Sequence, residues 1–394
     1  MRHLLLIPFV SAAMPIQAQQ PPATGDVVAT LDTTESFRSG TSLFWSPVGQ
    51  AAWDRLRAYH GVKNIHLKPH TPVADVLNAF QWEAEKTLPD RTVVFSGDDS
   101  EKFREKIRAE LRQTVGANAA AVIDAYKSPS RVDENTVRLH SALMVSCLSH
   151  SPRFPVSFKT WGAGFQLSGG HKPLVEGFGC QGDDAAAHTN AVRVVADDME
   201  GTFLLALACH TGEKVRPEFM LVGMNPKLTN LAEGIEWMRQ SMKKPLPIDQ
   251  AVKRGNAWWR YHHGLTAADY FWMPKLKTTL SCEFGELIGK EYLETGLENG
   301  DRTFWRIGQV QQLLVFRMNE EGVMAQAVFK LPSDFLLSAG AGTPEPKPVD
   351  ATTLPLLPRR FLFDRPFIAT LWMKGAEWPY LACWVDSETI LVKK

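Results

Sequence analysis

Four residues near the middle of the chain have the spacing of a known nucleophile motif. Ser241-Met242-Lys243-Lys244 fits the Ser-x-x-Lys pattern, in which a lysine activates the serine of penicillin-binding enzymes. Those enzymes also carry a Lys-Thr-Gly segment, whereas the nearest stretch in this sequence is Lys277-Thr278-Thr279. Because so short a pattern often occurs by chance, we predict a helix end here. We assign no catalytic residue, and we expect that the chain is not an enzyme.

Two adjacent histidines are the next residues that could do chemistry. His262 and His263 could offer imidazole nitrogens to a metal, but no acidic or cysteine residue stands at the spacing of a metal site. The stretch Trp161-Gly162-Ala163-Gly164-Phe165 lacks the third glycine of a dinucleotide-binding loop, so it predicts a turn. We therefore predict neither a metal nor a cofactor.

The charge balance bears on the class of partner. The 394 residues include 43 Lys and Arg against 43 Asp and Glu, so the formal net charge is zero. A neutral chain lacks the positive field that attracts phosphate backbones and anionic lipid, so we expect neither nucleic acid nor a membrane as partner. Five basic residues would form a polyanion site only if they gathered on one face, and a solvated surface is the expectation. They are Lys243, Lys244, Lys253, Arg254 and Arg260.

The N-terminus has the pattern of a signal peptide over residues 1–18. Arg2 and His3 precede an apolar run from Leu4 to Val10, and Ala18 marks a small-residue cleavage site. A buried first strand is the alternative interpretation. We expect a secreted or periplasmic protein, with a polar segment over 19–42 and a single domain over 43–394. Its five cysteines lack C-x-x-C spacing, which favours isolated buried thiols over a disulfide framework.

Helical and strand patterns alternate along the rest of the chain. Ser46 is the expected N-cap of the first helix, with Pro47 in the first turn and Gly61 as its stop. Further helices are predicted at 72–86, 98–115, 117–126, 231–242 and 283–289. Strands are predicted at 43–45, 91–95, 136–147, 165–167, 191–195, 203–208, 219–222, 271–280, 309–318, 361–372 and 380–385. The pattern indicates an α+β domain with a helical N-terminal part and large, mostly antiparallel sheets.

A proline-rich stretch over 331–360 separates the last strands from the rest. It holds six prolines and two glycines, and proline removes backbone donors and favours extended geometry. A structureless segment of this length inside a compact domain is usually functional. We therefore predict an exposed, projecting loop.

Several stretches resemble, in the correct order, the serpin family of protease inhibitors. Phe44-Trp45-Ser46-Pro47-Val48 is similar to the opening of its central helix, and Trp272-Met273-Pro274-Lys275-Leu276-Lys277 to one of its strands. Thr92–Phe95 and Asp133–Leu139 are similar to two strands of the family's main sheet, and Gln309–Ala327 to the strand and hinge that open its reactive loop. Phe361–Ile368 is similar to its C-terminal signature, and Pro379–Leu381 to its last strand. The tryptophan that the family often carries after its central strand is missing near Ser149. The resemblance covers roughly residues 43–386 and implies a serpin-like fold with a reactive loop over 323–360.

The resemblance implies that the loop pivots on a hinge and enters a sheet as an extra strand. The hinge residues would be Glu320, Glu321, Gly322, Val323, Ala325 and Ala327. Glycine tolerates the backbone change at the pivot. Because strand side chains alternate, Val323, Ala325, Ala327 and Phe329 would share the inserting face. Val323 and Phe329 are bulkier than the family's inhibitory hinges usually carry there.

The family's spacing from Glu320 implies a scissile bond at Leu336-Leu337 or Leu337-Ser338. These apolar residues suit a chymotrypsin-like protease, while Arg359-Arg360 is a trypsin-like alternative that we expect to be a solvated strand start. The implied function is inhibition of a serine (or cysteine) protease by a monomer, through loop cleavage and strand insertion. The alternative is a non-inhibitory binding protein whose long loop engages a partner without insertion.

Overall fold

The computed structural model describes residues 26–90, 92–114, 139–162, 164–167, 174–210, 218–244, 246, 249–294, 303–326 and 354–394. The helix predicted at 117–126 lies outside these residues. So do Ala327, Phe329 and the candidate reactive bond at Leu336, Leu337 and Ser338. The described part folds into three main sheets, and most neighbouring strands are antiparallel, as predicted for an α+β domain.

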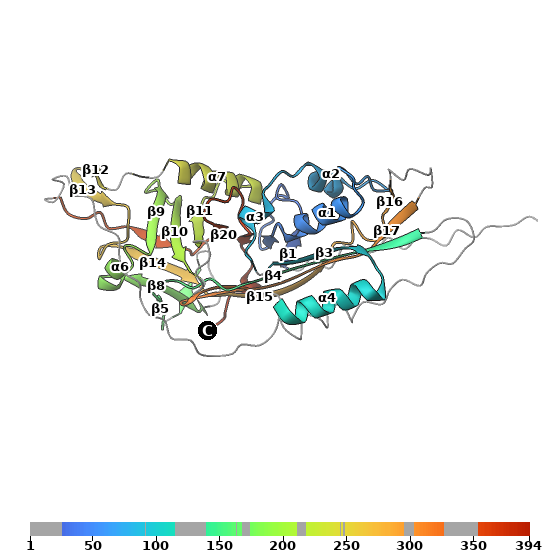
Figure 1. Ribbon diagram of the computed structural model, residues 1–394. Coiled ribbons are helices and arrows are strands. Elements are labelled where there is room, and N and C mark those ends of the chain that lie inside the picture. The colour runs from blue at the N-terminus through green and yellow to red at the C-terminus, as the bar shows by residue number, and fades with distance from the viewer. Residues whose placement is uncertain are drawn as a thin grey trace, which may run out of the picture.

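The main sheet has six strands in the order β15-β17-β18-β4-β3, with β16 paired to β17. All its pairs are antiparallel except β4 with β17, which run parallel. The strands are β3 (Thr92–Asp98), β4 (Leu139–His150), β15 (Leu276–Glu283), β16 (Glu291–Glu294), β17 (Thr303–Asn319) and β18 (Gly322–Gln326). Figure 1 shows them as long, nearly aligned ribbons through one half of the molecule.

Helices cover both faces of this sheet (Figure 1). On one face lies α1 (Val48–Tyr59), whose Trp53 and Leu56 are fully buried, and it ends where Gly61 takes a positive φ of 63°. On the opposite face lies α4 (Glu101–Thr114), because Ile107 and Leu111 form a buried stripe at helical spacing. Two short helices, α2 (Pro72–Ala79) and α3 (Ala84–Thr87), complete the helical N-terminal part.

The second sheet has seven strands in the order β1-β2-β21-β20-β11-β10-β9. They are β1 (Val27–Thr30), β2 (Ser42–Trp45), β9 (Val192–Asp197), β10 (Phe203–Cys209), β11 (Glu218–Met224), β20 (Phe367–Met373) and β21 (Leu381–Val385). Every residue of β20 and β21 is buried, because one face packs on the central core and α7 (Leu231–Lys243) packs on the other. This explains why both strands are continuous apolar runs rather than alternating ones.

The third sheet has the order β19-β14-β8-β5, formed by β5 (Lys159–Thr160), β8 (Gly177–Gln181), β14 (Tyr270–Pro274) and β19 (Arg360–Leu362). The hairpin of β12 (Asp249–Arg254) and β13 (Ala257–His262) projects at one end of the molecule (Figure 1). The remaining elements are short: β6 (Phe165–Gln166), β7 (Leu174–Val175), α6 (Asp183–Ala187) and the 3-10 turn Glu388–Ile390.

Several local predictions were wrong in detail. The strand expected at 361–372 is divided into β19 and β20, which lie in different sheets. The helix expected at 72–86 is divided into α2 and α3, because Phe80 is extended and its ring packs against Trp378. The helix expected at 283–289 is a run of turns, in which the Leu287 N–H donates to the Phe284 carbonyl at 2.9 Å. Pro47 occupies the N-cap position of α1, and the Ser46 hydroxyl instead donates to the Tyr380 carbonyl at 2.8 Å.

Candidate functional site

The predicted hinge forms a tight hairpin at the end of the long strand β17. The chain turns at Glu320 and Glu321, and β18 runs back along β17 with Asn319 opposite Gly322 and Phe316 opposite Ala325. The side-chain oxygen of Asn319 accepts a hydrogen bond from the Glu321 N–H at 3.1 Å. The segment therefore reverses direction within two residues, as a two-residue hairpin does.

Glycine is the only residue type that fits position 322, the pivot of the predicted hinge. Its φ of 153° lies outside the range that L side chains readily adopt. A Cβ at this position would also lie 2.5 Å from the Pro152 carbonyl oxygen and 2.7 Å from Arg153 Cα, closer than real contacts allow. The backbone of β18 thus passes directly against the segment that follows β4.

That segment holds the turn by its backbone. The N–H groups of Phe154 and Phe158 donate to the carbonyls of Glu321 and Glu320, each at 2.9 Å, and the Val323 N–H donates to the Pro152 carbonyl at 2.8 Å. Backbone groups of this segment therefore satisfy both glutamate carbonyls and the Val323 N–H of the pivot. The root of the loop is fixed in place, and any movement must begin after it.

Glu320 is held by an ion pair to the third sheet. Lys275 Nζ lies 2.9 Å from the Glu320 carboxylate and 3.2 Å from that of Glu176. Burial acts to raise the pKa of Glu320, but the hydrogen bond and charge of Lys275 outweigh it, so this pKa lies below its ordinary value. Lys275 is the single residue between β14 and β15, so the ion pair joins the pivot to the point where the chain passes between two sheets.

The first two side chains after Gly322 differ in burial. Val323 is 2% exposed and packs in the central core with Phe316 and Met318, whereas its neighbour Met324 is only half-buried. The main sheet therefore accepts a β-branched side chain at this first buried position. The bulk of Val323 is no obstacle to strand pairing there.

Beyond the turn, β18 lies between β4 and β17. Ala325 and Gln326 pair antiparallel with His150 and Ser149 of β4 while β18 keeps its pairing with β17. Further along, β4 and β17 pair directly, from Leu313 opposite Cys147 to Phe304 opposite Leu139. The start of the loop thus already occupies one end of the space between two parallel strands.

Several known structures superpose loosely on this chain at low sequence identity. No protein-family model and no curated protein matches the sequence. Human thyroxine-binding globulin superposes with a TM-score of 0.43 at 10% identity, over 88% of this chain and 92% of that protein. A serpin from the trematode Schistosoma haematobium gives 0.44 at 10% identity over 88% and 94%, and Manduca sexta serpin-12 gives 0.43 at 13% identity over 90% and 95%.

The chain has a divergent serpin-like fold. Its own strand order agrees with the order of the sequence motifs: a tight turn follows the long strand β17, β18 pairs with both β17 and β4, and the C-terminal strands lie in a second sheet. In this serpin-like chain the motif over 272–277 is divided between two sheets, since β14 ends at Pro274 and β15 begins at Leu276.

A buried polar cluster lies next to the end of β18. His150, the partner of Ala325, has its Nε2 2.6 Å from the Glu218 carboxylate, and the Tyr380 hydroxyl donates to the same oxygen at 2.9 Å. The His150 and Tyr380 rings also meet edge to face, with centroids 5.4 Å apart. Burial, followed by the Glu218 charge, holds the pKa of Tyr380 well above its ordinary value, so the hydroxyl remains a donor. Sequence patterns did not identify this cluster.

Arg359 was wrongly expected to be solvated. Its guanidinium is 3% exposed, donates to both Asp269 carboxylate oxygens at 3.0 and 2.7 Å, and also donates to the carbonyls of His262 and Gly264. The Asp269 carboxylate also accepts a hydrogen bond from the Arg359 backbone N–H at 3.1 Å. Arg360 is exposed and begins β19, as predicted for a strand start. The buried pair therefore fixes the point at which the loop returns to the third sheet.

The remaining chemical candidates do not come together. Ser241 lies in the last turn of α7 and Lys244 is its C-cap, which confirms the predicted helix end. Among the described residues, no three His, Cys, Asp or Glu side chains lie together as metal ligands would. The thiols of Cys180, Cys209 and Cys383 are free, and these three cysteines and Cys147 are all buried. Within the described part of the chain, no helix has the length and apolarity to cross a membrane.

Proposed function

We propose that this chain is an exported serpin-type inhibitor of serine (or cysteine) proteases, acting outside the cytoplasm as a monomer. The observation that supports the proposal most directly is the position of β18 between β4 and β17. A loop that had to enter the sheet from solution would first lose the entropy of ordering its leading residues. Here those residues are already ordered, and the pairing can extend from them.

The register of β18 predicts where an extended strand would stop. If β18 were extended in the same register, Val328 would lie between Leu313 of β17 and Cys147 of β4, which form the first direct pair of the β4–β17 ladder. Continued along that ladder, Leu336 would reach Leu139 of β4 and Leu337 would reach Phe304 of β17. The last residue that the sheet can take thus coincides with the scissile bond implied by the family's spacing.

Insertion would replace the direct β4–β17 ladder by two ladders, one between the inserted strand and β4 and one between the inserted strand and β17. About ten residues would enter, and at roughly 1 kcal/mol net per hydrogen bond the gain is on the order of 10 kcal/mol. In the proposed reaction the protease's serine hydroxyl attacks the carbonyl of Leu336 or Leu337, the new ester bond replaces the peptide bond, and the proton passes to the leaving amine. Insertion of the acylated strand would then carry the protease along the sheet and distort it before water attacks the ester. Apolar residues at the bond favour a chymotrypsin-like target.

A non-inhibitory binding protein is the second candidate. The direct ladder between β4 and β17 is closed from Leu313 to Phe304, and every pair of it must open before the loop can enter. If the closed sheet is the stable form after cleavage as well, the long proline-rich loop would engage a partner without insertion.

Incubation with chymotrypsin-like and trypsin-like proteases separates the two candidates. We expect a covalent complex that survives denaturing electrophoresis, and a rise of 10 °C or more in melting temperature after loop cleavage. Ala327→Arg should abolish both, because a charged side chain on the inserting face cannot enter the core. Gln326→Arg is the matched control, since it adds the same charge one residue away on the opposite face. Clean nicking of the loop, with neither a complex nor a rise in melting temperature, would establish the binding protein instead.

A further inference from the structure

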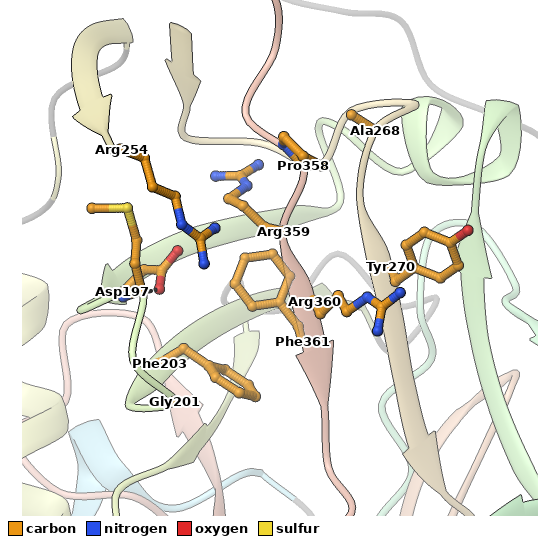
Figure 2. A pocket seen from close by; sticks show the side chains of 11 residues that line it. Asp197, Gly201, Phe203, Arg254, Ala268, Tyr270, Pro358, Arg359, Arg360 and Phe361 are labelled. Atoms are coloured by element: carbon orange, nitrogen blue, oxygen red, sulfur yellow. Dashed lines mark hydrogen bonds between the residues drawn. The ribbon is translucent and has the colours of Figure 1, made fainter. Parts of the chain in front are cut away.

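A cavity of about 440 Å³ lies where the loop returns to the third sheet. Figure 2 shows it bounded by Arg254 and Asp197 on one side, Tyr270 on the other, and Arg360 and Phe361 between them. These residues come from β12, β9, β14 and β19, so four elements distant in sequence meet at its walls. The volume falls within the range of small-molecule sites.

The charges at the cavity do not cancel. The Arg359 guanidinium already donates to Asp269 and to two backbone carbonyls, so it is not available to a ligand. Within the described chain the Arg254 guanidinium has neither a hydrogen bond nor an ion pair, and Arg360 is only stacked over the Tyr270 ring, 5.6 Å from its centroid. Asp197 is the single acidic side chain in the wall, and it accepts from the Met199 N–H at 2.8 Å. The wall thus carries two available guanidinium groups, Arg254 beside Asp197 and Arg360 beside Tyr270, against one carboxylate, which leaves a net positive site.

A second hollow adjoins the first and shares two of its residues. It measures about 430 Å³ and is lined by Arg254, Pro358, Trp259 and Leu357, among others. Arg254 therefore stands between a charged hollow and one that carries an indole ring. Guanidinium groups bind carboxylate and sulfonate oxygens through paired N–H donors, and aromatic faces bind flat apolar groups.

We propose that the two hollows form one binding site for a small amphipathic anion. Its carboxylate or sulfonate lies between Arg254 and Arg360, and its flat apolar body packs against Trp259. A bound anion would contact the β12–β13 hairpin and the start of β19 together, so it would tie the returning end of the loop to the body of the molecule. The site does not depend on whether the loop inserts.

Titration calorimetry with three probes of one shape tests the site. Naphthalene-2-sulfonate should bind at least tenfold more tightly than neutral 2-naphthol, and cationic 2-naphthylmethylamine should bind most weakly. Arg254→Ala should reduce the affinity for the sulfonate at least tenfold, and Arg254→Lys should retain part of it because lysine keeps the charge but not the paired donors.

Lys253→Ala is the matched control. It removes the same charge from the adjacent residue of β12, which points to the other face of the strand and lines neither hollow. Its affinity for naphthalene-2-sulfonate should change less than twofold. Equal binding of the sulfonate and the naphthol, or equal losses in Arg254→Ala and Lys253→Ala, would overturn the proposal. Because calorimetry reads binding alone, such a result would leave the proposed inhibitor function unaffected.

Discussion

Ala325 lies directly opposite His150, as the first residue of β18 that pairs with β4. The pair lies just beyond the end of the direct β4–β17 ladder, whose last rung joins Leu313 to Cys147. The main sheet is therefore neither fully closed nor fully expanded at this end. Insertion of the loop would have to begin by opening the Leu313–Cys147 rung.

Locking that rung should block insertion. Leu313→Cys would place a thiol opposite the native Cys147 in a parallel pair, where neighbouring strands are close enough for a disulfide. After oxidation we expect no covalent protease complex and no rise in melting temperature on loop cleavage. A reducing agent should restore both.

The control for the locked sheet is the double variant Leu313→Cys with Cys147→Ala, treated with the same oxidant. It carries the same new thiol but no partner, so its behaviour should not respond to oxidation or reduction. Undiminished complex formation by the oxidised single variant, with its disulfide shown by mass spectrometry, would mean that this rung does not open during inhibition.

The Glu320–Lys275 ion pair should contribute pH-dependent stability. The pKa of Glu320 lies below its ordinary value of 4.5 because Lys275 outweighs the opposing effect of burial. A carboxylate with a depressed folded pKa stabilises the fold above its unfolded pKa, and this stability is lost as the pH falls through the folded value. Glu320→Gln should therefore lower the free energy of unfolding by about 0.5–1 kcal/mol at pH 7, as for other partly exposed pairs.

Chemical denaturation at pH 7 and pH 3 measures this contribution. The difference between wild type and Glu320→Gln should shrink at the lower pH. Glu321→Gln is the matched control, because the adjacent Glu321 side chain is exposed. A difference of the same size at both pH values would show that the glutamine acts through packing rather than charge.

Asp269→Asn should be strongly destabilising. The Asp269 and Arg359 side chains are almost completely buried and joined by two hydrogen bonds, so neutralising one partner leaves a buried guanidinium without its counter-charge. The expected loss is about 3–5 kcal/mol in the free energy of unfolding. Arg360→Gln, at an exposed site in the next position, should change it by less than about 0.5 kcal/mol. Equal effects in a urea titration would contradict the assigned role of the pair.

Tyr380→Phe should weaken the cluster beside the hinge. It removes a 2.9 Å donor to the buried Glu218 carboxylate without creating a cavity. The cost of leaving that acceptor less satisfied is about 1–3 kcal/mol in the free energy of unfolding. Tyr270→Phe changes a half-exposed tyrosine by the same atom and should cost less than about 0.5 kcal/mol. An unchanged stability in Tyr380→Phe would mean that His150 alone satisfies Glu218.

The sequence predicted those parts of the fold that local patterns determine. Apolar spacing identified α1, α4 and α7. Continuous apolar runs identified β21, but the strand predicted at 361–372 joined β19 and β20, which lie in different sheets. The turn at Gly322 was also accessible from the sequence, because glycine has a local conformational meaning, whereas the role of this turn as a hinge stays a prediction. The resemblance then supplied the order in which these elements meet.

Features created by distant contacts could not be predicted in this way. Arg359 has the local sequence of a solvated strand start, and only the approach of Asp269 explains its burial. His150, Glu218 and Tyr380 stand on three strands, and no spacing rule relates them. The division of the helix predicted at 72–86 depends on Trp378, nearly three hundred positions away in the sequence.

The Asp269–Arg359 pair secures the C-terminal end of the loop, while the backbone of Phe154 and Phe158 secures the other. If the bond near Leu336 is cut, the freed C-terminal stub remains tethered at Arg360. In the proposed mechanism the other fragment would then enter the opened ladder and advance by about 3.3 Å for each residue that pairs. Ten such steps would draw the two new chain ends on the order of 30 Å apart, too far for the protease to rejoin the bond that it has broken.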